Sequence, residues 1–150
     1  MKTTTEFKRV LIVDDDEMIL DSFELLFDTN NFPNFHFDLC ETVEDAMFKI
    51  MNGEPYDLVI VDLRMGGPDP SNLGCSGPYV LQAFLKTARK DAVAVVISSQ
   101  LDEFLIRKNV DGQILMFSKP FKIQFLWSMA EEAYTYLRAG HSPKRSMFYI

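Results

Sequence analysis

The sequence predicts an α/β layer fold built around a parallel sheet. Four short apolar runs are rich in Val and Ile and do not alternate with polar residues; they span residues 10–13, 58–61, 92–97 and 114–117. Such runs are typical of strands that are buried on both faces of a parallel sheet. Segments with helical spacing separate the runs, and this alternation favours right-handed crossover connections between neighbouring strands.

The first half of the chain is expected to add an edge strand and two helices. One helix carries an apolar stripe of Ile19, Phe23, Leu26 and Phe27. Residues 35–39 alternate apolar and polar side chains, which indicates an edge strand with one wetter face. A second helix starts after Thr42, because Thr42 with Asp45 three residues on is typical of a capping pair, and residues 52–53 (Asn-Gly) end it.

Three further helices are expected in the second half. Pro78 opens the first of them, since proline is favoured in the first turn of a helix. Residues 101–109 form a short helix in this prediction, and residues 123–139 form a longer one that Gly140 stops. Residues 66–77 are rich in Gly, Pro and Ser and are predicted to be an irregular loop.

The composition fits one globular domain, which we place at residues 1–140. The net charge of −7 disfavours nucleic acid as a partner, because phosphate backbones bind Lys and Arg. No apolar run is long enough for membrane insertion, and residues 1–6 lack the apolar stretch of a signal peptide. Two cysteines do not make a disulfide framework, so we expect a cytoplasmic protein.

Residues 141–150 are expected to form a C-terminal tail, with no output domain after residue 140. A frayed terminus is the favoured interpretation of this tail. The alternative is a docking peptide, because residues 147–150 are four large hydrophobic residues in a row.

Polar residues follow four of the predicted strands at their carboxyl ends, where ligands bind in open α/β sheets. Crowded carboxylates need a cation, and Mg²⁺ suits them because it takes hard oxygen ligands. Carboxylates, Mg²⁺, a lysine and a hydroxyl together form a clamp for a phosphoryl group, and a carboxylate can accept that group as an acyl phosphate. The residues that follow the four strands are Asp14, Asp15 and Asp16 after the first, Asp62 after the third, Ser98 and Ser99 after the fourth, and Lys119, with Pro120 next to it, after the fifth.

These motifs resemble those of the receiver domains of two-component response regulators. The resemblance covers roughly residues 8–138, and its pieces are residues 10–16, 56–65, 95–99 and 117–121. It implies the flavodoxin-like receiver fold, a doubly wound five-stranded parallel sheet of order 2-1-3-4-5. It also implies a phosphoacceptor signalling module, rather than an ordinary enzyme, that changes conformation and binds partners once phosphorylated.

The resemblance assigns a role to each site residue. Asp62 is the expected phosphoacceptor, and Ser98 and Lys119 are expected to contact the phosphoryl group. The expected protein ligands of Mg²⁺ are Asp14, Asp15, Asp62 and the main-chain carbonyl of Arg64. The peptide bond before Pro120 is expected to be cis. Asp16 is left as a charge that is favoured at a helix N-terminus.

The same resemblance implies the partners. The expected phosphodonor is a phosphohistidine on a sensor histidine kinase or a histidine phosphotransfer protein, and a downstream effector protein is expected to read the result. A second copy of the chain is a further candidate, docking through the face made by the 101–109 helix, the fifth strand and the last helix.

Three features depart from the family pattern. The loop after Asp62 is longer, with Gly77 fifteen residues on instead of about eight. Ser98 stands where Thr is usual, which keeps the hydroxyl. Met116 stands where Tyr or Phe is usual, which puts the aromatic readout of the family in doubt but not the phosphorylation.

Two other functions stay open at this point. A degenerate receiver would bind partners without being phosphorylated. A haloacid-dehalogenase-like phosphatase also places its Asp nucleophile after the first strand, and Asp14 and Asp16 have that spacing. However, Met18 replaces the small residue expected there, and no acidic pair follows Lys119.

The remaining polar residues concern the lifetime of the phosphate or have no assigned role. Arg64 and Gln100 occupy positions that help to set this lifetime in the family. Shielding by Arg64 is judged the stronger influence, which predicts slow hydrolysis. His36 and His141 are expected to be structural or exposed, and Cys75 is expected to be a spectator thiol.

Overall fold

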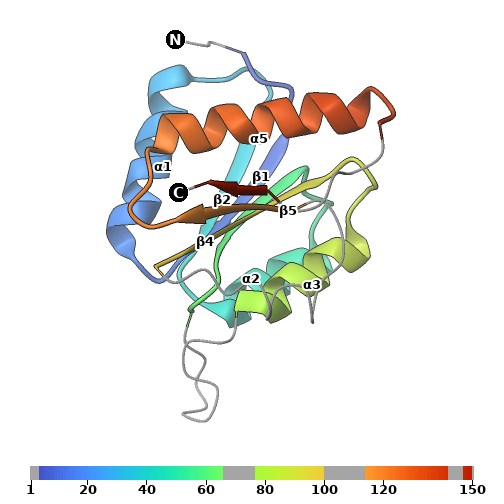
Figure 1. The fold of residues 1–150 in the computed structure, drawn as a ribbon. Coiled ribbons are helices and arrows are strands. Elements are labelled where there is room, and N and C mark those ends of the chain that lie inside the picture. The colour runs from blue at the N-terminus through green and yellow to red at the C-terminus, as the bar shows by residue number, and fades with distance from the viewer. Residues whose placement is uncertain (1–3, 66–76, 100–113, 142–146, 150) are drawn as a thin grey trace.

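A computed structural model describes residues 4–65, 77–99, 114–141 and 147–149 of the chain. Within these residues a parallel sheet lies between two layers of helices (Figure 1). The strands are β1 Arg9–Val13, β2 His36–Cys40, β3 Leu58–Asp62, β4 Val93–Ser98, β5 Ile114–Ser118 and β6 Met147–Tyr149. The helices are α1 Glu17–Asn30, α2 Val43–Asn52, α3 Gly77–Thr87 and α5 Ile123–Arg138.

The sheet has the order β2-β1-β3-β4-β5-β6. The predicted α/β class and the order 2-1-3-4-5 of the first five strands are therefore confirmed. Every residue of β3 and β4 is buried, as their unbroken apolar runs predicted, and β2 is the half-exposed edge strand. The predicted 101–109 helix, Gln100 and residues 66–76 with Cys75 lie outside the described residues.

The two faces of the sheet bury separate hydrophobic clusters. Helices α1 and α5 cover one face, and α2 and α3 cover the other (Figure 1). Side chains of β1 alternate between the two, with Ile12 on the first face and Leu11 on the second. Aromatic rings fill the first face, where Trp127 of α5 lies 5.2 Å from Phe27 of α1 between ring centroids.

Helix starts follow the capping residues in the sequence. The Thr42 hydroxyl accepts a hydrogen bond from the N–H of Asp45 at 3.1 Å, which confirms the predicted cap of α2. Asp16 is the N-cap of α1, because its carboxylate accepts from the N–H of Met18 at 3.0 Å. Its place at a helix N-terminus is as predicted.

Residues 147–149 form a sixth strand, so the prediction of a frayed tail was wrong for this segment. β6 runs parallel to β5, with Leu115 opposite Met147 and Phe117 opposite Tyr149. Without β6, the outer edge of β5 would leave its backbone N–H and C=O groups without strand partners. Residues 147–149 therefore pair with the edge of their own sheet. Residues 142–146 and 150 lie outside the described residues.

A buried carboxylate fastens the amino-terminal edge of the sheet. Asp57, just before β3, accepts hydrogen bonds from the main-chain N–H groups of Lys8 and Arg9 at 2.7 and 3.2 Å. Its other oxygen pairs with the guanidinium of Arg89, which follows α3. These contacts tie the starts of β1 and β3 together, at the opposite edge from the predicted site.

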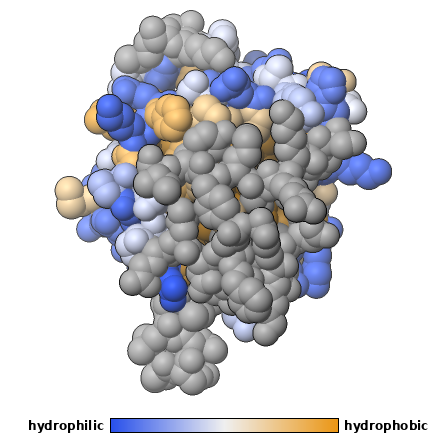
Figure 2. All heavy atoms as spheres, viewed as in Figure 1, coloured by the Kyte–Doolittle hydropathy of each residue, from blue (hydrophilic) through white to orange (hydrophobic). Residues whose placement is uncertain are grey.

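The described surface on the face shown in Figure 2 is mostly hydrophilic, with hydrophobic residues gathered beside α5. Within the described part of the chain, no helix combines the length and apolar character needed to cross a membrane. Among the residues whose side chains are described, the large apolar ones that are at least half exposed are Met18, Leu25, Phe48, Met51, Tyr79 and Phe125.

Candidate functional site

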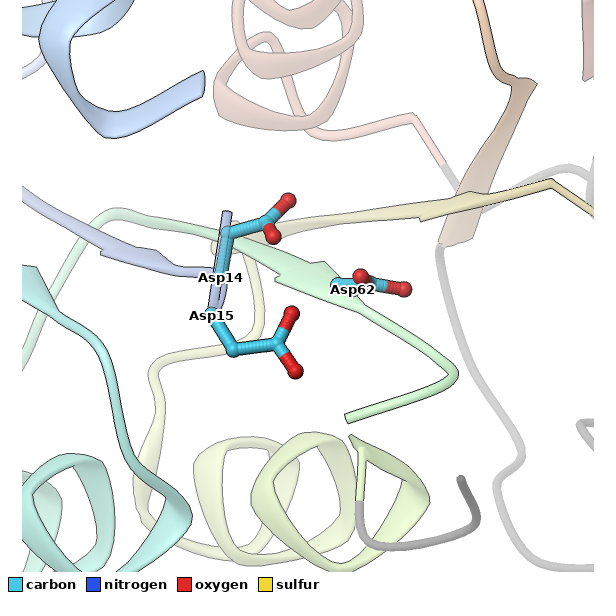
Figure 3. Close-up of side chains that lie close together, drawn as sticks. All are labelled: Asp14, Asp15 and Asp62. Atoms are coloured by element: carbon cyan, nitrogen blue, oxygen red, sulfur yellow. The ribbon is translucent and has the colours of Figure 1, made fainter. Parts of the chain in front are cut away.

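Three carboxylates meet at the carboxyl edge of the sheet. Asp14 and Asp15 directly follow β1, and Asp62 ends the neighbouring strand β3. One oxygen from each residue lies within 4.8 Å of the others. Figure 3 shows that Asp14 and Asp15 direct their carboxylates toward the side on which Asp62 lies. Asp14 and Asp62 are buried, whereas Asp15 is exposed and open to solvent.

Lys119 brings a positive charge to the two buried carboxylates. Its Nζ atom donates a hydrogen bond to Oδ2 of Asp62 at 3.0 Å and lies 3.5 Å from Oδ2 of Asp14. The lysine directly follows β5, and its N–H donates to the carbonyl of Ser98 at 2.8 Å. The Lys119–Pro120 peptide bond is cis, as the family resemblance implied.

Burial and neighbouring charges shift the pKa values of Asp14 and Lys119. Burial, reinforced by the charge of Asp62, raises the pKa of Asp14 from 3.8 to about 6, although the Asp16 N–H and Lys119 partly offset it. Burial opposes the charge of Lys119 as well. The hydrogen bond to Asp62 and the negative charge of Asp14 outweigh that effect and raise the pKa of Lys119. Excess negative charge therefore remains beside one ammonium group.

The donor set fits a hard divalent cation such as Mg²⁺. Oδ2 of Asp14 is buried and makes no hydrogen bond within the described part of the protein. An added cation would satisfy that oxygen and offset the excess charge of the cluster. Among the described residues, Asp14, Asp15 and Asp62 form the only cluster of three or more Asp, Glu, His or Cys side chains that is close enough to hold a metal ion.

Arg64 and Ser98 complete the predicted set. The turn after β3 folds back on Asp62, because the N–H of Arg64 donates to Oδ1 of Asp62 at 2.9 Å. Ser98 is buried at the end of β4, next to the strand that carries Asp62. Met116, three residues before Lys119, is buried in the hydrophobic cluster under α2 and α3.

The two histidines, which were predicted to be structural or exposed, have contacts away from the cluster of Asp14, Asp15 and Asp62. His36 lies 3.3 Å from Asp38 on β2, and the ring of His141 stacks on Tyr136 with centroids 4.5 Å apart. Sequence reasoning did not anticipate an apolar groove beside the site or the close packing of Gly77 on the backbone of Asp62 and Leu63. Met18 and the apolar residues around Pro120 were the available signals for the groove.

The sequence matches the family described as "Response regulator receiver domain" over residues 10–131. The chain belongs to this family. Receivers are signalling modules of two-component systems, in which their partners are histidine kinases. The acidic triad of Asp14, Asp15 and Asp62 is the arrangement typical of the metal site of a receiver.

Solved structures show the same fold at low sequence identity. A CheY-like receiver domain protein from Methanospirillum hungatei JF-1 has a TM-score of 0.67 and 21% identity, and the match covers 91% of this receiver and 100% of that chain. For a receiver protein from Sinorhizobium medicae WSM419, the TM-score is 0.68, the identity 21%, and the coverage 87% and 96%.

A third structure, a response regulator from Burkholderia pseudomallei, contains a phosphorylated aspartic acid, a calcium ion and citrate. Its TM-score is 0.64 and its identity 15%, and the match covers 89% of this receiver and 72% of that chain. A comparison with curated protein sequences gives no match.

Proposed function

We propose that this receiver accepts a phosphoryl group on the carboxylate of Asp62 in a Mg²⁺-dependent transfer from a phosphohistidine. The observation that carries the proposal is the position of Asp62, which lies beside the two aspartates that follow β1 and 3.0 Å from the ammonium of Lys119. The phosphorylated receiver would then bind a downstream effector. We place it in the cytoplasm, where a histidine kinase or phosphotransfer protein can reach it.

The transfer forms a P–O bond to an oxygen of Asp62 and breaks the P–N bond of the donor imidazole, which leaves with its electron pair. The two oxygens of Asp62 have different partners: Oδ1 accepts from the Arg64 N–H, and Oδ2 faces Lys119. A phosphoryl group on Oδ2 would lie next to the ammonium, which would neutralise part of its charge. The hydroxyl of Ser98 is the second proposed contact.

Asp14, Asp15, Asp62 and the carbonyl of Arg64 are the proposed ligands of Mg²⁺. When bound, Mg²⁺ supplies positive charge that offsets the phosphoryl oxygens as the new bond forms. The exposed position of Asp15 leaves one side of the cluster open to solvent. The bound ion could therefore keep several waters, as Mg²⁺ usually does.

A groove of about 560 Å³ beside the site suits the approach of a protein donor. Met18, on the α1 side of the groove, is 77% exposed and is therefore available for contact with a partner. Lys119 also lines this groove, so a helix docked there would hold its phosphohistidine near Asp62. The lining residues are Asp16, Met18, Ile19, Ser22, Lys119, Pro120, Phe121 and Ile123.

The other functions fit the geometry less well. A phosphatase of the haloacid-dehalogenase type would use Asp14 as the nucleophile and Asp16 as the acid, but the Asp16 carboxylate caps α1 by accepting from the N–H of Met18. A degenerate receiver would lack part of the acceptor set, whereas every predicted member is present. The predicted contact with a second copy includes the fifth strand, whose outer edge is paired with β6. We therefore give a second copy no part in the transfer.

The test is phosphorylation by acetyl phosphate with Mg²⁺, followed by intact mass. We expect one added phosphoryl group that is labile to hydroxylamine, and no addition to Asp62→Asn or in the presence of EDTA. Asp57→Asn is a matched control, because this second buried carboxylate lies at the other edge of the sheet. Phosphate on Ser98 or Ser99 would refute the acyl-phosphate mechanism.

A further inference from the structure

Gly77, the first residue of α3, packs directly on the backbone of the proposed phosphoacceptor. A Cβ atom built at this position would lie 2.6 Å from the carbonyl oxygen and 2.7 Å from the Cα of Leu63, and closer still to the carbonyl oxygen of Asp62. These distances are shorter than real Cβ contacts, and the obstructing atoms are main-chain atoms that cannot rotate away. Only glycine allows this approach.

The turn cannot simply retreat from an added side chain. On its other side, the N–H of Leu63 donates to the carbonyl of Ile97 in β4 at 2.9 Å. The side chains of Leu63 and Met65 are both buried in the cluster under α3. A methyl group at position 77 must therefore push the backbone of Asp62 and Leu63 against β4 or lift the start of α3.

The start of α3 is also held in place. Val80, Leu81 and Phe84 of the helix are buried in the same cluster as Leu63 and Met65. Lifting the helix would open a gap under these side chains, which costs several kcal/mol in a close-packed core. Part of any displacement is therefore expected in the turn that carries Asp62 and Arg64.

We infer that Gly77 is a positioning residue that sets where the Asp62 carboxylate and the Arg64 carbonyl stand relative to Asp14 and Asp15. The inference rests on the proposed function for its consequence, since those groups are the proposed Mg²⁺ ligands. Mg²⁺ requires near-octahedral oxygen ligands at about 2.0–2.1 Å, so a shift of a few tenths of an ångström weakens its binding. Gly77 makes this contact although it lies fifteen residues after Asp62 in the chain.

Gly77→Ala is compared with Gly53→Ala, a control with the same kind of clash. A Cβ at Gly53 would lie 2.7 Å from the carbonyl oxygen of Lys49, at the end of α2 before β3 begins. Both substitutions press a methyl group on a main-chain carbonyl, but only Gly77 touches the turn after Asp62. Urea unfolding measures the stability that each variant loses.

Two readouts separate positioning from general destabilisation. In metal-free protein, ¹H–¹⁵N spectra should show displaced amide signals for residues 62–65 in Gly77→Ala but not in Gly53→Ala. In Mg²⁺ titrations followed by calorimetry, we expect Gly77→Ala to lose about tenfold or more in affinity, as supporting residues of metal sites do. Gly53→Ala should stay within about twofold of the parent. A folded Gly77→Ala with parental amide signals and affinity would overturn the inference.

The design keeps the two proposals apart. A parent receiver that binds no Mg²⁺ would sink the proposed function, and the metal-free spectra would still test Gly77. If Gly77→Ala does not fold in dilute buffer, the comparison is repeated in trimethylamine N-oxide, which favours compact states. A chain that stays unfolded there would show that Gly77 serves folding instead of positioning, and would also overturn the inference.

Discussion

The Nζ atom of Lys119 lies 3.0 Å from Oδ2 of Asp62, although the two residues are 57 positions apart in the chain. The contact exists because both residues stand at the carboxyl edge of one sheet. In the metal-free receiver the ammonium offsets charge that a divalent cation would otherwise neutralise. Lys119 and a bound cation would therefore compete for the same negative potential. The proposed phosphoryl group would add negative charge, which both of them could offset.

Replacing Lys119 by Gln should strengthen Mg²⁺ binding and weaken phosphorylation. Removal of a unit charge about 3 Å from a proposed ligand raises Mg²⁺ affinity, by an order of magnitude in a partly screened site. Calorimetry measures the affinity, and intact mass after acetyl phosphate measures the phosphorylation. Lys122→Gln removes an exposed lysine three residues away and should change neither. Equal Mg²⁺ affinity in parent and Lys119→Gln would contradict the competition.

Replacing Asp14 by Asn should stabilise the metal-free receiver at neutral pH. The pKa of Asp14 is about 6 in the fold against an ordinary 3.8, so the folded state holds the proton more tightly. The resulting stabilisation is present in full below pH 3.8 and is lost as the pH rises through 6. Above that, the ionised carboxylate costs on the order of 2 to 3 kcal/mol, which Asn removes while it still accepts from the Asp16 N–H.

Urea unfolding in EDTA at pH 4 and pH 7.5 checks this sign. The advantage of Asp14→Asn over the parent should grow between the two pH values, and Mg²⁺ binding should be lost. Asp15→Asn is the control, because that carboxylate belongs to the same cluster but is exposed. A parent whose stability does not fall relative to Asp14→Asn across this range would disprove the assignment.

Loss of Asp57 should destabilise the fold without touching the site. Asp57→Ala leaves two main-chain N–H groups without their acceptor and removes one of the two carboxylates that pair with Arg89, at a cost of about 2 to 4 kcal/mol. Arg89→Met should cost less, because the N–H groups of Lys8 and Arg9 still hold the carboxylate. Chemical unfolding measures both variants. Mg²⁺ affinity should stay parental in each variant. A large loss of affinity would mean that the contacts of Asp57 affect the geometry of the site at the opposite edge of the sheet.

Removal of the Arg64 side chain should shorten the lifetime of the phosphoprotein. The main chain of Arg64 is bonded to Asp62 Oδ1, so its side chain starts beside the proposed acyl phosphate. A guanidinium there stabilises the ground-state charge and takes space from the attacking water. Decay of the phosphorylated parent, Arg64→Ala and Arg64→Asn is followed by intact mass. Decay that is no faster in either variant means that Arg64 does not shield the phosphate.

A charge in the apolar groove should separate docking from chemistry. Met18→Glu places a carboxylate among apolar lining residues, at a side chain that is open to solvent. Transfer from a phosphorylated histidine kinase that serves the parent should fall at least about tenfold, whereas phosphorylation by acetyl phosphate should not change. Leu25→Glu is an exposed control on the same helix. Equal losses with both donors would place the defect in the site itself.

The central strands and the caps could be predicted because their signals are local. The run from Leu58 to Val61 is apolar throughout because both faces of β3 are covered, and Thr42 caps a helix only three residues away. The convergence of Asp14, Asp62 and Lys119 followed from the rule that ligands bind at the carboxyl edge of such sheets.

The remaining features depend on contacts that are distant in sequence. Whether Met147–Tyr149 frays or pairs depends on the free edge of β5, about thirty residues upstream. The packing of Gly77 on Asp62 is likewise invisible in the sequence, where the two are fifteen residues apart. The burial of Asp14 sets its pKa, and one acidic run cannot reveal which of its members will be buried.

The position of β6 also bears on how the sheet is assembled during synthesis. From β3 onward the order of strands along the chain is their order across the sheet, so each new strand emerges beside the one made just before it. Domains generally fold as units, so this sheet is completed only when all of its strands are available. Until residues 147–149 appear, β5 would present an open edge to chaperones or to neighbouring nascent chains.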